Sequence, residues 1–125
     1  SERVARLKAC RRAKLFRVGE WIIALSHVSA YQASAARAIV ELGAHVAVVA
    51  GQKNENLEIS LRCTRDFQEK TGIHLGKDIA KPLGEFLKGM GGGHASAAGV
   101  NGLGDVETGL KRCFRLLKEE LSNQE

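Results

Sequence analysis

The sequence predicts an α/β fold, in which a mixed sheet of about four to five strands is flanked by helices and preceded by a basic linker helix. Two apolar runs of strand length, residues 21–25 and 45–50, enclose an alanine-rich helical segment over 31–42 that ends at Gly43. Strand, helix and strand within roughly thirty residues form a βαβ unit, so these two strands are expected to be parallel. A third strand, residues 57–64, follows a polar turn and is expected to be antiparallel to the second.

The third strand is recognised by its strict alternation of apolar and polar side chains. The residues expected to face the core are Leu57, Ile59, Leu61 and Cys63, and those expected on the opposite face are Glu58, Ser60, Arg62 and Thr64. A strand of this kind buries one face of a sheet and leaves functional groups free on the other.

Helical spacing predicts three further helices. Apolar residues at three-residue steps predict a helix over 2–16, and another is expected over 76–88, with Pro82 either tolerated near its start or producing a kink. A glycine run stops that helix, and residues 97–102 are expected to form a short strand. Asp105 is expected to cap a C-terminal helix.

The composition is typical of one soluble domain, with 125 residues, 44% of them hydrophobic and 26% charged. No apolar run approaches the ~20 residues of a membrane span, so no membrane association is expected. The cysteines, Cys10, Cys63 and Cys113, are odd in number and include no C-x-x-C pair, which favours buried reduced thiols in a cytoplasmic protein. Met90 is the only methionine, so we expect the chain to be part of a longer protein.

Positive charge is concentrated at the N-terminus. The formal net charge is +5, and residues 1–17 carry seven Lys and Arg against one Glu, a net charge of +6. We therefore divide the chain into a basic linker helix over 1–17 and a domain over 18–125. The basic segment could contact phosphate backbones or face an acidic neighbouring domain, and composition favours neither.

The most unusual stretch is the glycine run Gly91-Gly92-Gly93, followed by His94. A helix C-terminus requires only one left-handed glycine, so three suggest a further function. Glycines let backbone N–H groups approach an anion closely, and a neighbouring histidine can donate a directional hydrogen bond. The run therefore predicts a loop that binds phosphate.

Ser60 and Arg62 form a second candidate site, because a hydroxyl and a guanidinium on one strand face suit a phosphate or sugar contact. An exposed face on which Glu58 pairs with Arg62 is an equally good interpretation. Between the first strand and the next helix, His27 is interpreted as structural and Ser29 as the helix N-cap. His45 and His74 are assigned no role.

Known nucleotide and catalytic motifs are missing. The sequence contains no G-x-x-x-x-G-K-[ST], and a G-x-G-x-x-G starting at Gly91 fails at Ser96. The aspartates, Asp66, Asp78 and Asp105, are far apart, with no D-x-D and no H-E-x-x-H motif. We therefore expect no catalytic residue, no metal ligand and no cofactor in this chain, and interpret it as a binding domain.

The nine residues from Gly91 to Gly99, GGGH-x-x-AAG, resemble the hallmark of the DHH-associated domain, subfamily 1. This is the C-terminal domain of RecJ-like phosphoesterases of the DHH family. The strand around Ser60 and Arg62, the βαβ unit and the alanine-rich helix also fit, so the resemblance covers about residues 18–121. Met90 departs from the pattern, because many relatives have a fourth glycine there.

The resemblance implies that a separate N-terminal DHH domain of the same polypeptide holds two manganese ions. The associated domain would grip the phosphate of a short single-stranded nucleic acid or a dinucleotide. Carried over, His94 and the amides of Gly91, Gly92 and Gly93 would hold phosphate, with Arg62 and Ser60 in support. RNA, DNA, dinucleotide and cyclic dinucleotide substrates remain open, as does a homodimer.

Two alternatives belong to other functional classes. A related C-terminal domain of alanyl-tRNA synthetases is a tRNA-binding and dimerising module with a glycine-rich loop, although the histidine is less typical there. The other alternative is a pure interaction domain that docks through its basic helix. A phosphate-binding domain should prefer short single strands, whereas a tRNA module should prefer structured RNA.

Overall fold

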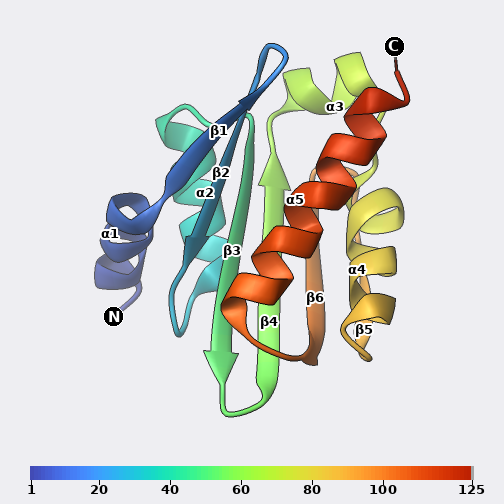
Figure 1. The fold of residues 1–125 in the computed structure, drawn as a ribbon. Helices are drawn as coiled ribbons and strands as arrows, with labels where there is room; N and C mark the ends of the chain where they lie inside the picture. Colours follow the sequence, from blue (N-terminus) through green and yellow to red (C-terminus); the bar gives the residue numbers. More distant parts are fainter. Residues whose placement is uncertain (125) are drawn as a thin grey trace.

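A computed structural model describes residues 1–124, which form a six-stranded mixed sheet between two layers of helices (Figure 1). The strand order is β1-β2-β3-β4-β6-β5. The strands are β1 (Lys14–Val18), β2 (Trp21–His27), β3 (Val46–Lys53), β4 (Asn56–Cys63), β5 (Met90–Gly93) and β6 (Ala97–Leu103). The helices are α1 (Glu2–Arg12), α2 (Gln32–Leu42), α3 (Arg65–Thr71), the π-helix η1 (Leu75–Ala80), α4 (Lys81–Phe86) and α5 (Val106–Ser122). The predicted fold class is confirmed, with one strand more than expected.

The βαβ unit is present as predicted. β2 and β3 are parallel, with Ile23 opposite Val46, and α2 connects them. α2 ends at Gly43, whose N–H bonds back to the helix. All other strand pairs are antiparallel, which makes the sheet mixed.

The sheet separates two hydrophobic cores. The larger core lies between the sheet and the layer of α3, η1, α4 and α5, and it contains the apolar side chains of β4 together with Phe67 and Leu117. The smaller core joins β2 and β3 to α1 and α2 and is built from small side chains such as Ala9, Ala36 and Ala47. The predicted alternation of β4 is therefore confirmed: its apolar residues enter the larger core, and Ser60 and Arg62 face the side of α2.

The helix predicted over 2–16 ends earlier than expected. α1 stops at Arg12, and residues 14–18 form the edge strand β1, which pairs with β2 through a turn at Gly19. Gly19 has φ +61, a left-handed conformation that glycine adopts without strain. The prediction was wrong beyond Ala13 because it followed the apolar spacing of α1 into residues 14–16. Those residues become a strand through pairing with β2, which helical periodicity does not reveal.

α1 is held against the sheet rather than standing free. Ala9 is fully buried, and the hydroxyl of Ser26 in β2 donates a 2.7 Å hydrogen bond to its carbonyl. The guanidinium of Arg12 donates to the carbonyl of His27 at 3.2 Å. The basic segment thus packs on the same sheet as the rest of the chain.

The glycine run also differs from its prediction. Residues 90–93 form strand β5, paired with β6, rather than a loop. The helix expected over 76–88 is present as η1 followed by α4, and Pro82 is tolerated in the first turn of α4. Ser29 does not cap α2, which starts after Tyr31 without a side-chain cap.

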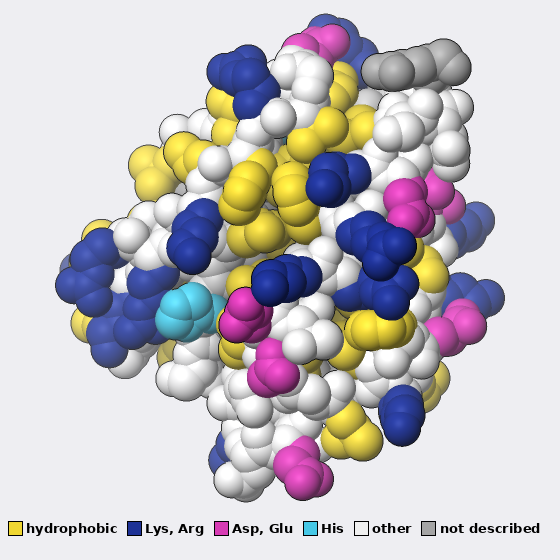
Figure 2. Space-filling model, in the orientation of Figure 1, with side chains coloured by type: hydrophobic (Ala, Val, Ile, Leu, Met, Phe, Trp, Pro, Cys, Tyr) yellow, Lys and Arg dark blue, Asp and Glu magenta, His cyan; other side chains and the backbone are white. Residues whose placement is uncertain are grey.

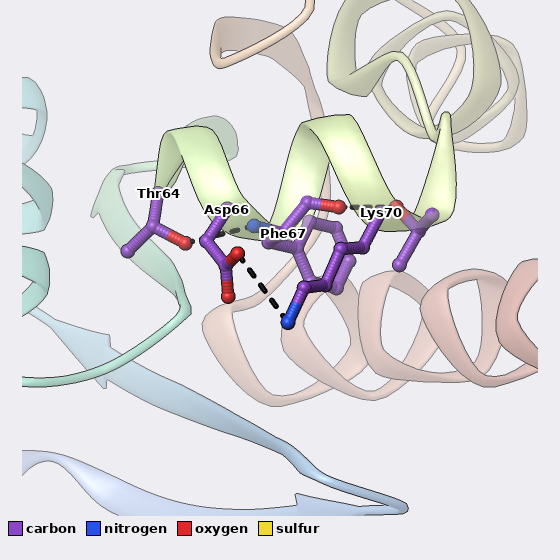
Figure 3. Close-up of polar contacts among 5 residues, drawn as sticks. Thr64, Asp66, Phe67 and Lys70 are labelled. Atoms are coloured by element: carbon purple, nitrogen blue, oxygen red, sulfur yellow. Dashed lines mark hydrogen bonds and ion pairs between the residues drawn. The ribbon is translucent and has the colours of Figure 1, made fainter.

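α3 is a helix that the sequence pattern did not reveal (Figure 3). Thr64 caps it by accepting a hydrogen bond from the N–H of Phe67 at 3.1 Å, and Asp66 pairs with Lys70 at 3.6 Å. The buried ring of Phe67 anchors it in the larger core. Because the capping residue Thr64 directly follows β4, Arg62 and Cys63 are the last two residues of that strand.

None of the helices in residues 1–124 is both long and apolar enough to cross a membrane.

Candidate functional site

The sheet register brings several predicted site residues onto one face. Ser60 lies opposite Gly99 of β6, and Gly99 lies opposite Gly92 of β5. Directly paired residues in antiparallel strands point to the same side of the sheet. Ser60, Gly99 and Gly92 therefore form one row across three strands, on the side of the sheet that carries α1 and α2.

Arg62 and His94 belong to the next row. Arg62 lies opposite Ala97, and the N–H of His94 donates to the carbonyl of Ala97 at 2.8 Å. Two strand spacings separate the backbones of Arg62 and His94, about 10 Å. Ala97, which has a small side chain, lies between them in the register.

This face is open over β6 and β5. Within residues 1–124, α1 packs on β2 and α2 packs on β3 and β4, whereas Gly92, Gly93, Gly99 and His94 are exposed. Ser60 and Arg62 are half-buried at the border of α2. We call the exposed surface formed by β4, β6 and β5 on this side the open face.

Gly91, Gly92 and Gly93 differ in what a side chain at each position would contact. A Cβ on Gly91 would collide with the carbonyl of Ala80 in η1, and Gly93 has φ +136 with Ala98 close by. A Cβ on Gly92 would meet nothing within 4 Å and would project onto the open face. Gly91 and Gly93 are thus required by packing and conformation, whereas no contact within the described chain requires Gly92.

The strand conformation corrects the predicted anion nest. A nest needs successive N–H groups that converge, but successive N–H groups of a strand point in opposite directions. Gly91 also faces the larger core rather than the open face. The described geometry therefore gives Gly92 a place on the open face, and Gly91 a place against η1.

Backbone hydrogen bonds from η1 hold the segment that contains His94. The carbonyl of His94 accepts a 3.1 Å hydrogen bond from Gly76 of η1, and the next carbonyl, of Ala95, accepts from Leu75. η1 itself is capped by His74, whose Nδ1 accepts from the N–H of Lys77 at 3.0 Å. His74, which the sequence analysis left without a role, therefore stabilises the segment that positions His94.

The residue after Arg62 in β4 is Cys63, whose thiol could pair with the guanidinium only if it were ionised. Burial raises the pKa of the Cys63 thiol to about 11, and the adjacent Arg62 guanidinium opposes this shift. Cys63 is therefore neutral near pH 7. Within residues 1–124, no ion pair joins Arg62 to Glu58, so the pairing weighed in the sequence analysis is not formed.

Two of the three cysteines agree with the prediction of buried reduced thiols. Cys63 and Cys113 are buried free thiols, whereas Cys10 is only half-buried. Burial also raises the pKa of Cys113. His45 has a structural role, because its Nδ1 accepts a 2.9 Å hydrogen bond from the N–H of Ile22.

Sequence reasoning missed two residues of the open face, Gly99 and Asn101. Both lie on β6 directly opposite polar residues of β4, Gly99 opposite Ser60 and Asn101 opposite Glu58. The signal was present in the two-residue spacing of residues 97, 99 and 101, which alternates with buried Val100. Pairing with β4 could not be read from that spacing.

A model of the DHHA1 domain matches residues 12–123. The chain belongs to the DHHA1 family. A curated relative, an uncharacterized protein of Methanocaldococcus jannaschii, is 36% identical over 130 residues, which cover 96% of this chain. The chain spans about 39% of the length of that relative.

Two solved structures share the fold of this DHHA1 domain. The C-Ala domain of alanyl-tRNA synthetase from Aquifex aeolicus has a TM-score of 0.64 at 21% identity, covering 87% of this chain and 98% of that one. A pGpG-specific phosphodiesterase from Vibrio cholerae has a TM-score of 0.56 at 14% identity, covering 99% of this chain and 40% of that one. The predicted relation to DHH-family proteins is confirmed by the family match.

The described part of the DHHA1 domain has no cluster of metal-binding side chains. Among the residues that the structure describes, no three His, Cys, Asp or Glu side chains lie together as metal ligands would.

Proposed function

We propose that this DHHA1 domain binds the phosphate of a short single-stranded nucleic acid or a dinucleotide on its open face, as the accessory domain of a DHH-family phosphoesterase. The observation that carries the proposal is the register that lines up Ser60, Gly99 and Gly92, with Arg62 and His94 in the adjoining row. A surface without side chains at its centre and with donors at its border suits a bulky anion.

Each donor contributes differently. The guanidinium of Arg62 can form a charge-assisted, bidentate contact with phosphate oxygens, and the Ser60 hydroxyl can donate two residues along the same strand. His94 can donate from its ring across the small side chain of Ala97. Gly92 leaves room for the anion, because it has no side chain on the open face.

The hydrolysis itself would belong to another part of the protein. We propose that a DHH domain of the same polypeptide holds the manganese ions and that this chain positions the substrate beside them. Support comes from the family match and from the length of the Methanocaldococcus jannaschii relative, which far exceeds this chain. The phosphodiesterase similarity supports a dinucleotide-sized ligand.

A second candidate function is a tRNA-binding module. It is favoured by the likeness to the C-Ala domain, which matches this chain over almost its whole length, and by the net charge of +6 in residues 1–17. Such a module would bind folded RNA through distributed phosphate contacts rather than through the open face.

The experiment is fluorescence anisotropy with a labelled dinucleotide, a short single strand and a folded tRNA, at two salt concentrations. The variants are Arg62→Ala and His94→Ala. Arg65→Ala is the control for lost positive charge, since the Arg65 side chain is 89% exposed on α3, and His27→Ala is the control for a lost surface imidazole.

We expect Arg62→Ala and His94→Ala to weaken dinucleotide binding by about 1–3 kcal/mol each, the range for a lost hydrogen bond to a charged group. Arg65→Ala and His27→Ala should leave it unchanged. Dinucleotide binding that survives both test variants would contradict the proposal. Preferential binding of tRNA, insensitive to Arg62 and His94, would favour the second candidate.

A further inference from the structure

The open face continues beyond the phosphate donors to a third row of side chains. Glu58 of β4 lies opposite Asn101 of β6, and Asn101 lies opposite Met90 of β5. All three are exposed, Met90 to 81%. This row is two residues along each strand from the row of Ser60, Gly99 and Gly92, about 7 Å.

A hollow of about 550 Å³ adjoins this row. Glu58 and Asn101 line it, together with Gly51, which lies opposite Glu58 on β3. A side chain at position 51 would collide with the amide of Gln32 and the carbonyl of Val28, so only glycine fits, and the Gln32 side chain lies over Gly51 beside the hollow. The volume lies in the range of small-ligand sites.

The two ends of the open face, one at Arg62 and His94 and the other at Glu58, differ in their hydrogen-bonding groups. Near the phosphate, the guanidinium of Arg62 offers only donors and the imidazole of His94 can donate, whereas the carboxylate of Glu58 offers only acceptors. Lys53 and Lys88 also line the hollow, so it is not acidic as a whole. What distinguishes it is the adjacent pair of a carboxylate, which accepts hydrogen bonds, and an amide, which can both donate and accept.

We propose that this hollow receives the nucleobase of the bound ligand and that Glu58 and Asn101 select guanine. The inference rests on the proposed function, because it takes the phosphate to lie between Arg62 and His94. Arg62 lies four residues after Glu58 on β4, about 13 Å away, so a dinucleotide can place a phosphate at the donors and a base beside Glu58.

Guanine is selected by its hydrogen-bonding edge. Its Watson–Crick edge presents two adjacent donors, N1–H and the N2 amino group, and one acceptor, O6. The carboxylate of Glu58 can accept from both donors, and the amide of Asn101 can donate to O6. Adenine presents a lone pair at N1, which the carboxylate repels. The exposed thioether of Met90, at the far end of the row, can contact the face of the base.

The test compares the labelled dinucleotides pGpG and pApA on the 125-residue chain by anisotropy. We expect pGpG to bind at least tenfold more tightly than pApA, the discrimination that one bidentate base contact provides. Glu58→Gln should lower the affinity for pGpG about tenfold, because the introduced amide group faces a donor of guanine. The same substitution should leave binding of pApA unchanged or slightly stronger, which also shows that the variant is folded.

The matched control is Glu55→Gln, which removes the same charge from the nearby turn between β3 and β4, away from the open face. It should change the affinities for both dinucleotides by the same factor. Equal binding of pGpG and pApA, or a Glu58→Gln variant that behaves like Glu55→Gln, would overturn guanine selection while Arg62-dependent binding leaves the phosphate site standing. Absence of binding by either dinucleotide would overturn both proposals.

Discussion

Gly91 and Gly92 are neighbours in β5 that face opposite sides of the sheet, so a side chain at each position would meet different surroundings. A Cβ at position 91 would collide with the carbonyl of Ala80, whereas a Cβ at position 92 would enter open space. A sequence pattern treats the glycines alike. The structure assigns them to different tasks, one against η1 and one on the open face.

Substitution by alanine tests this division. Gly91→Ala should lower the free energy of unfolding by about 1–3 kcal/mol, because η1 must move away from β5. Gly92→Ala should change it by less than about 1 kcal/mol, since the strand conformation suits alanine. Gly92→Ala should nevertheless weaken dinucleotide binding, because its methyl group projects onto the open face. Urea denaturation and anisotropy measure the two effects.

Equal destabilisation by both substitutions would contradict the assignment of Gly92 to the open face. A stable Gly92→Ala variant that binds the dinucleotide as tightly as the unaltered chain would show that the phosphate lies elsewhere.

Among the elements, α1 differs most from expectation, because it packs on the sheet although the sequence predicts a linker helix. The carbonyl of Ala9 is one of the last four of α1, which have no partner within the helix. The buried hydroxyl of Ser26 donates to it. A freely exposed linker helix would not require a buried donor on β2 at this point.

We expect Ser26→Ala to lower the free energy of unfolding by about 1–3 kcal/mol, because it leaves a buried carbonyl without a hydrogen bond. Ser29→Ala, at an exposed position in the loop after β2, is the matched control and should have little effect. Chemical denaturation of both variants measures the difference. Equal stability of the two would mean that α1 is not docked in solution.

The elements also show what could be predicted from the sequence. β2, α2, β3 and β4 carry their own signals, because an apolar run, an alanine-rich helix and a strict alternation each arise within one segment. β1 and β5 do not, since Lys14–Val18 and the glycines of Met90–Gly93 become strands only through pairing with β2 and β6. The candidate site was predictable to the same extent: Arg62, Ser60 and His94 could be named as candidates, but their alignment on the open face depends on the register.

On the scale of the whole molecule, the excess of positive charge lies apart from the arginine of the candidate phosphate site. The α5 side carries both signs, with the pairs Lys111–Glu107 at 2.9 Å and Arg115–Glu119 at 3.4 Å, and Figure 2 shows Lys and Arg interspersed with Asp and Glu there. The excess lies in residues 1–17, whereas Arg62 stands on the open face. Nonspecific and specific binding should therefore respond to different residues.

Salt dependence can separate these two modes of binding. Each phosphate contact to a single strand contributes a slope of about −0.7 to the logarithm of the affinity against the logarithm of the salt concentration. A dinucleotide held by Arg62 and His94 makes one or two such contacts, so we expect a slope of about −0.7 to −1.4. A longer single strand should also reach α1 and give a steeper slope.

The triple variant Arg3→Gln, Lys8→Gln, Arg11→Gln removes three exposed charges of α1 and leaves the open face intact. It should reduce the slope for the longer strand by up to about 2 and leave the dinucleotide slope unchanged. Anisotropy titrations at four salt concentrations measure both. A dinucleotide slope that falls together with the slope of the longer strand would mean that α1 holds the short ligand as well. In that case the binding site would lie on the basic helix, and the open face would be only a packing surface of the sheet.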